Sequence, residues 1–120
     1  MIGWDEVLTL CLRDGARHVR RGCGLSGRQM AEGFMVGAAY GGQYSARIPV
    51  DGGYCAKAVW DGLGEAEREG RWSVGLGDVV VRGEAGEGEE MEALRARGFV
   101  VKEVLEAVGG LGRHVEVRGG

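Results

Sequence analysis

The chain contains few of the residues that disulfides and metal sites need. Its 120 residues include three cysteines, two histidines and one proline. The cysteines are odd in number and show no Cys-x-x-Cys spacing, which argues against both a complete disulfide framework and a zinc knuckle. We expect Cys11, Cys23 and Cys55 to be buried free thiols in a reducing compartment. The sequence therefore predicts no bound metal and no cofactor.

Signs of catalysis are equally few. A nucleophilic site needs a base beside a cysteine or serine, and nothing in the spacing of His18 and His114 demands such a pair. The stretch "GLSGRQ", residues 24–29, resembles part of a phosphate-binding loop but lacks the Gly-Lys-Ser/Thr ending. We predict that the protein is not an enzyme, and a small enzyme of unrecognised type remains the third functional hypothesis.

Long apolar runs are also missing. No stretch approaches the roughly 18 apolar residues that span a membrane, and residues 1–12 lack the basic start of a secretory signal. We expect a soluble protein that is made in the cytoplasm and has no membrane partner.

Glycine, by contrast, is abundant, with 25 residues. These glycines follow no collagen period, so they indicate turns and bulges in a chain that reverses direction often. A chain of this length is typical of one domain, and we expect residues 1–120 to form a single unit.

Alternating apolar residues predict several short strands. An Asp14–Gly15 turn separates the first two, and Pro49 ends the third. The stretch 99–108 fits a helix or a strand, and its β-branched start favours the strand. The predicted strands and alternating stretches are 7–12, 16–21, 44–49, 72–74, 79–82, 99–108 and 114–118.

One short helix is predicted from Glu89 to Arg97, where glutamates precede arginines, with Gly98 as its C-cap. Residues 54–60 could hold one further helical turn. The fold class that follows is mainly β (α+β), a small, partly closed antiparallel β-barrel with one short helix.

Two similar phrases, "VVVRGE" and "VEVRGG", each predict a strand closed by a charge and a turn glycine. Alternate residues of a half-buried strand share a face, so we expect a buried set from these strands and the preceding tryptophan. It consists of Trp72, Val79, Val81, Val115 and Val117. The final Arg-Gly-Gly resembles the tail of ubiquitin-like modifiers but follows a strand without a spacer, which favours a frayed terminus.

Charge is unevenly distributed around a net value of −3. Residues 1–30 carry five arginines against three carboxylates, a net of +2, and residues 61–97 carry ten acids against five arginines, a net of −5. This layout suits head-to-tail contact between copies, although charge alone favours the simpler explanation of a solvated surface. The predicted subunit interface comprises Arg17, Arg20, Arg21, Glu87, Glu89 and Glu90. We expect these arginines to be exposed, so that reversing their charge leaves the subunit folded.

The order of several motifs resembles a family of small uncharacterised prophage structural proteins, similar to phage head-closure and head–tail connector proteins. The motifs are "HVRRGCG" (18–24), "SARIPV" (45–50), "WSVGLGDVVVRG" (72–83) and "RHVEVRGG" (113–120). The chain departs from the family pattern at "VKEVLEAV", where the family has a Thr-Ser-rich strand.

The resemblance implies a structural subunit of a head–tail connector or neck assembly, in an infectious phage or a phage-tail-like particle. It implies a homo-oligomeric ring that contacts portal, connector and tail proteins, with DNA passing through its lumen without sequence-specific binding. The expected location is the neck or tail of the virion. The alternative hypothesis is a small monomeric binding or regulatory module that uses Arg17, Arg20 and Arg21 on an anionic partner.

Overall fold

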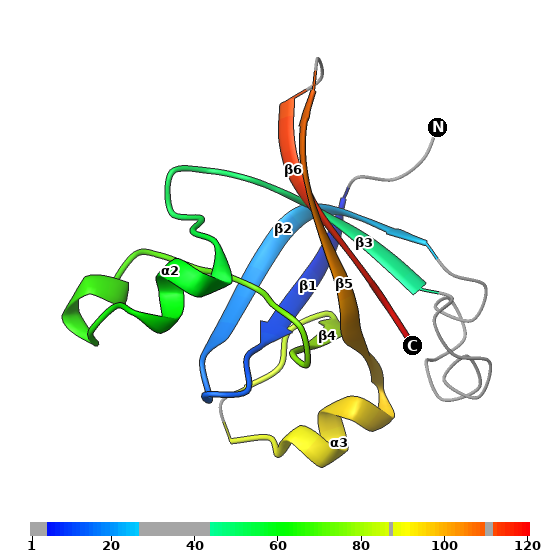
Figure 1. Cartoon of the computed structure of the whole chain (residues 1–120). Coiled ribbons are helices and arrows are strands. Elements are labelled where there is room, and N and C mark those ends of the chain that lie inside the picture. The colour runs from blue at the N-terminus through cyan, green and yellow to red at the C-terminus, as the bar shows by residue number, and fades with distance from the viewer. Residues whose placement is uncertain (1–4, 27–43, 87, 110–111) are drawn as a thin grey trace.

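Six strands close into an antiparallel barrel in the order β1-β2-β3-β6-β5-β4 in the computed structural model, which describes residues 5–26, 44–86, 88–109 and 112–120 (Figure 1). The predicted small antiparallel barrel is confirmed, and its closure is complete rather than partial. The strands are β1 (Glu6–Cys11), β2 (Arg17–Ser26), β3 (Tyr44–Pro49), β4 (Val79–Arg82), β5 (Gly98–Gly109) and β6 (Gly112–Gly119). The helical elements are α2 (Lys57–Asp61), the 3-10 turn η1 (Ala66–Arg68) and α3 (Met91–Ala96).

The first hairpin forms where the Asp-Gly signal predicts it. Asp14 accepts a hydrogen bond from the backbone N–H of Ala16 at 3.0 Å, and Gly15 adopts a positive φ of 103°. An aspartate that bonds two residues ahead, followed by a glycine, is a common way to close a tight turn. β1 and β2 then pair with Leu10 opposite His18.

The buried residues form two clusters on either side of β4. Val80 points into the barrel core, whereas Val79 and Val81 pack beneath α3 with Leu94. All five residues of the predicted buried set are buried, which confirms that prediction. The five do not share one face: Trp72, Val115 and Val117 belong to the barrel core, whereas Val79 and Val81 pack against α3. Both faces of β4 are buried because α3 covers its outer side.

Two glycines allow strands to approach closely. Gly98 is the first residue of β5, and a Cβ there would overlap the carbonyl oxygen of Val80. The predicted C-cap role is therefore wrong: Arg97 is the C-cap of α3, and Gly98 does not have a positive φ. Gly119 contacts the carbonyl of Val100 in the same way. The expected frayed terminus is wrong as well, since Gly120 O accepts a hydrogen bond from Val100 N at 3.2 Å.

Residues 50–77, here called the α2 lobe, connect β3 to β4 and carry α2 and η1 to one side of the barrel (Figure 1). The lobe is fixed to the core through Trp60 and Trp72, which are both buried. Alternation at residues 72–74 does not produce a strand. Trp72 forms only an isolated parallel bridge with Tyr54, and Ser73 is as buried as its apolar neighbours.

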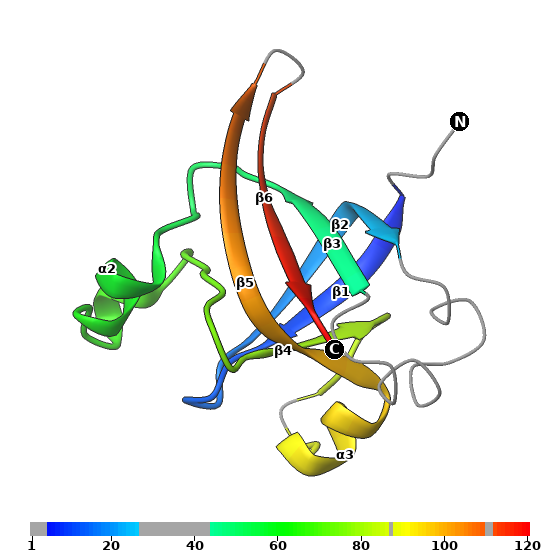
Figure 2. The ribbon, with the colours of Figure 1, turned by 45° about the vertical axis from the view of Figure 1, so that its right-hand side comes forward.

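The β5–β6 hairpin extends beyond the rest of the barrel, away from α2 and α3 (Figure 2). β5 pairs with β4 at its start, through Val100, and from Val101 onward it pairs with β6. A bulge between Val101 and Glu103 shifts the register of this second pairing. Among the described helices, none is long and apolar enough to cross a membrane.

The three cysteines are buried and unpaired, as the sequence predicts. Burial raises the pKa of the Cys23 thiol to about 11, so this thiol stays protonated at neutral pH.

Candidate functional site

The predicted interface arginines all lie on β2, and each contacts another part of the same chain. Arg17 donates to the carbonyl oxygens of Leu12 and Ala16 at 3.4 and 3.1 Å, and to that of Glu89 at 3.2 Å. Arg17 therefore ties the first hairpin to the acidic segment that precedes α3. The basic and acidic segments that we expected to meet between copies meet here within one chain.

Arg20 belongs to a compact group on the barrel wall. Its guanidinium lies 4.2 Å from the centre of the Trp72 ring and bonds the carboxylate of Asp51 at 2.7 Å. The Trp72 indole N–H donates to the same carboxylate at 2.9 Å, and the backbone N–H of Gly53 does so at 2.8 Å. These donors, led by the indole, lower the pKa of Asp51 to about 2.

The remaining predicted interface residues are more exposed. Arg21 forms an ion pair with Glu84 at 3.1 Å, and Glu89 forms one with Arg97 at 2.7 Å. Glu90 is exposed and is the N-cap residue of α3. Glu87 lies outside the described residues.

The expectation that all three arginines are exposed is therefore wrong. The side chain of Arg20 is only 23% exposed, and its stacking on Trp72 holds the α2 lobe against β2. Charge reversal at Arg20 would place a carboxylate beside Asp51, so it would disturb the fold as well as any interface.

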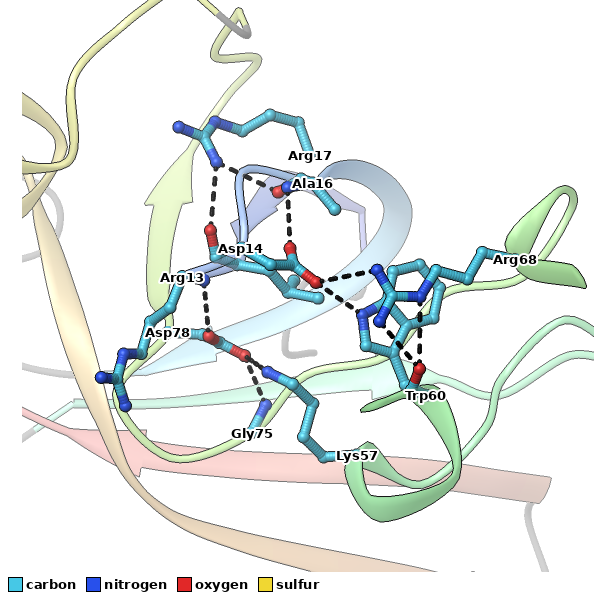
Figure 3. A network of polar contacts seen from close by, with 10 residues as sticks. Arg13, Asp14, Ala16, Arg17, Lys57, Trp60, Arg68, Gly75 and Asp78 are labelled. Atoms are coloured by element: carbon cyan, nitrogen blue, oxygen red, sulfur yellow. Dashed lines mark hydrogen bonds and ion pairs between the residues drawn. The ribbon is translucent and has the colours of Figure 1, made fainter. Parts of the chain in front are cut away.

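A second polar network joins the α2 lobe to the start of β4 and to the first hairpin (Figure 3). Asp78 is fully buried, and its carboxylate accepts hydrogen bonds from Lys57 Nζ at 2.8 Å and from Gly75 N at 2.7 Å. Its other oxygen accepts one from the backbone N–H of Arg13 at 3.0 Å. One carboxylate thus holds three segments together, with its charge compensated by the lysine.

Asp14 plays a similar part a short distance away. Besides closing its own turn, it accepts hydrogen bonds from the Trp60 indole at 2.9 Å and from Arg68 at 3.2 Å (Figure 3). The Arg68 guanidinium lies over the Trp60 ring, 4.5 Å from its centre. The His18 and Trp60 rings pack edge to face, with 5.1 Å between their centres. Burial, followed by the nearby charge of Arg20, lowers the pKa of His18 to about 4.

Beside this network the surface forms a hollow of about 590 Å³, which we call the α2 hollow. The Lys57 and Asp14 side chains on its wall are already engaged with Asp78 and with Trp60 and Arg68. Leu76 is 63% exposed, which is unusual for a large apolar side chain. The lining residues are Arg13, Asp14, Lys57, Ala58, Asp61 and Leu76.

Sequence reasoning identified none of these lining residues as functional. Asp14 was recognised only as a turn residue, and Lys57 and Asp78 carry no motif, because their pairing depends on how the α2 lobe folds back. The one available signal in the sequence was the position of Leu76 between Gly75 and Gly77. Within the described residues no three His, Cys, Asp or Glu side chains are grouped to hold a metal ion.

Comparisons with protein-family models, with curated proteins and with solved structures found no match to this chain.

Proposed function

We propose that the protein is a structural subunit of the head–tail connector or neck assembly of a phage or a phage-tail-like particle, where copies of it form a ring. The motif order that resembles small prophage structural proteins motivates this proposal. Portal, connector and tail proteins are its partners. Genomic DNA passes through the ring without sequence-specific binding, and the protein resides in the virion neck.

One structural observation supports the proposal most. A closed barrel carries two different projections, the β5–β6 hairpin and the α2 lobe, which extend in different directions (Figures 1 and 2). A subunit of a closed ring needs two dissimilar surfaces, because each copy contacts one neighbour with one surface and the other neighbour with the second. Because the barrel is closed, it holds these two surfaces in a defined position relative to each other.

The alternative module that binds an anion through Arg17, Arg20 and Arg21 has less support. These side chains already bond backbone carbonyls, Asp51 and Glu84 respectively. An anionic partner would have to compete with these intrachain contacts.

The test is to purify particles induced from a strain that carries the gene and to measure the protein by quantitative mass spectrometry. We expect the same number of copies in every particle, as a ring of fixed size requires. In a deletion strain we expect DNA-filled heads and separate tails that fail to join. Absence of the protein from washed particles, together with normal particles in the deletion strain, would refute the proposed function. In that case pull-down of an anionic ligand, lost in Arg21→Gln, would support the alternative.

A further inference from the structure

Residues 56–71, here called the α2 cap, carry α2 and η1 and reach the barrel core through one large side chain. Trp60 is the only buried residue of this segment, all of which the structure describes. Its indole N–H donates to Asp14 of the first hairpin, and Arg68 of the cap bonds the same carboxylate (Figure 3). The Trp60 ring packs against the ring of His18 on β2. The position of the cap therefore depends on whether Trp60 stays against His18.

The base of the cap is closed by backbone hydrogen bonds. Cys55 N donates to Trp72 O at 3.0 Å, and Trp72 N donates to Gly53 O at 2.8 Å. None of the six barrel strands includes a residue of the cap, so the strand pairing of the barrel is complete without it. Lys57 lies next to this base, so its ion pair with Asp78 can persist while the far end of the cap moves. The cap can therefore turn as a unit about its base.

The buried side of the His18 ring is not equipped to carry a charge. Its Nε2 atom is buried and has no hydrogen-bond partner among the described residues. A neutral imidazole can leave this nitrogen without a proton, whereas an imidazolium has an N–H at both nitrogens, one of which would then be buried without an acceptor. Burial, together with the charge of Arg20, accordingly lowers the pKa of His18 to about 4.

The charged groups around His18 come from four parts of the chain. Arg20 on β2 and Lys57 on α2 oppose a further positive charge, whereas Asp14 in the first hairpin and Asp78 before β4 favour one. Both carboxylates already accept hydrogen bonds from other donors, and neither bonds Nε2 of His18. A charged His18 is therefore accommodated only when its ring reaches water, which requires the cap to move away.

We propose that the α2 cap is a lid that opens when His18 becomes charged: Trp60 leaves the barrel wall, the cap turns about its base, and the six-stranded barrel stays closed. The cap also forms one side of the α2 hollow, through Lys57, Ala58 and Asp61. Opening removes that side, so the hollow is complete only in the closed form. The lid does not depend on the connector function, since every contact involved lies within one chain.

Proton binding sets the size of the effect. Because Trp60 belongs to the core cluster, the open form is a minor one at neutral pH. The pKa of His18 is about 4 in the closed form and at most 6.5 when the ring is exposed, so the equilibrium constant for opening rises by up to roughly 20-fold from pH 7 to pH 5. Against the opposing effect of burial, hydrogen bonds from Ala16 N and the Trp60 indole lower the pKa of Asp14, so this carboxylate stays charged throughout the range.

The test follows the exchange of single N–H groups with deuterated water by NMR, in the full-length protein at pH 7 and pH 5. After correction for the intrinsic exchange rate, the opening constant of the Trp60 indole N–H should rise by up to about 20-fold at pH 5. At both pH values it should exceed that of the Val101 backbone N–H, which bonds Asp78 O at 2.8 Å. Equal opening constants would mean that Trp60 is released only when the barrel unfolds, and would overturn the proposal.

Low concentrations of urea distinguish the two kinds of opening further. Urea promotes most strongly the opening that exposes most surface, so it should accelerate exchange at Val101 far more than at Trp60. An equal urea response at the two groups would again show that the cap has no opening of its own.

Variants of His18 identify the group that drives the opening. His18→Phe keeps a ring against Trp60 but cannot become charged, so the pH dependence of the Trp60 opening constant should disappear. His18→Gln is a second uncharged variant with a smaller side chain. His114→Gln is the matched control, because it removes the other histidine, on β6, and should keep the wild-type response. A pH response that persists in both His18 variants, or one that is absent in the wild-type protein, would contradict the proposed lid.

Discussion

The backbone of Gly119 lies directly against the carbonyl group of Val100, with no space for a side chain between them. This contact is where β6 joins the start of β5, and Val100 N donates to Gly120 O beside it. The glycine is required at this position by the close approach of the two strands.

Gly119→Ala should therefore destabilise the protein by about 2–4 kcal/mol, because the added methyl group forces the strands apart. Chemical denaturation measures the free energy of unfolding. Gly52→Ala is the control: a Cβ at Gly52 meets nothing within 4 Å, so a change below about 1 kcal/mol is expected there. Equal stability of both variants would show that β6 does not approach β5 in this way.

Val81→Asp should cost several kcal/mol, since it buries an unpaired carboxylate beneath α3. Val19→Asp, at an exposed position on β2, should change stability little. Thermal melting compares the two. An unchanged melting temperature for Val81→Asp would mean that β4 does not present this residue to α3.

Lys57 and Asp78 should show strong energetic coupling. Lys57→Met leaves a fully buried carboxylate without its cation, and we expect a loss of about 2–4 kcal/mol. The double variant Lys57→Met/Asp78→Asn should lose less than the sum of the two single variants, as measured in a double-mutant cycle. Arg21→Gln, which breaks the exposed pair with Glu84, should cost under about 1 kcal/mol. Strict additivity at Lys57 and Asp78 would contradict the pairing.

The Trp72 indole should control the ionisation of Asp51. Its hydrogen bond is the largest cause of the low pKa of Asp51, which is about 2. Trp72→Phe keeps a ring beneath Arg20 but removes the donor, so the pKa of Asp51 should rise toward its ordinary value. Carboxylate carbon chemical shifts during an acid titration report it. Tyr54→Phe is the control, because the Tyr54 hydroxyl bonds Glu106 and not Asp51.

His18 should make the protein less stable as the pH falls below neutrality. Its pKa is about 4 in the folded protein and 6.5 without burial, so between these values the unfolded chain binds more protons. The contribution of His18 to the free energy of unfolding is therefore fully present above about pH 6.5 and is lost as the pH falls to about 4. In urea denaturation at pH 7 and pH 5, His18→Gln should lose most of this difference. An equal difference in wild type and variant would place its origin elsewhere.

Local patterns were sufficient for most strands and for the helix before Gly98. Alternation, Asp14–Gly15 and the glutamate-then-arginine order are short-range signals, and the corresponding elements are present. The burial of Val79 and Val81 was predictable for the same reason, but their position beneath α3 was not, because periodicity does not reveal which element covers a strand.

The charge contacts were not predictable from the sequence. Arg21 and its ion-pair partner Glu84 are 63 residues apart, and Arg17 bonds the backbone carbonyl of Glu89, which is 72 residues away. Which charges meet depends on the strand order and on how the α2 lobe folds back against the barrel. A difference in net charge between two segments of the sequence gives no information on either. The exposed Leu76 and Leu105 were likewise visible only once burial was known.

The position of β6 between β3 and β5 affects how the chain can fold during synthesis. β1, β2, β3, β4 and β5 all leave the ribosome before the strand that unites them. Until β6 arrives, β3 and β5 each have an open edge with apolar side chains on their inner face, a state in which strands from different chains can pair wrongly. Barrel closure is thus a late step, because β6 is synthesised after the strands that it joins. We expect slow folding, and we expect the open sheet to need protection from other chains until β6 pairs.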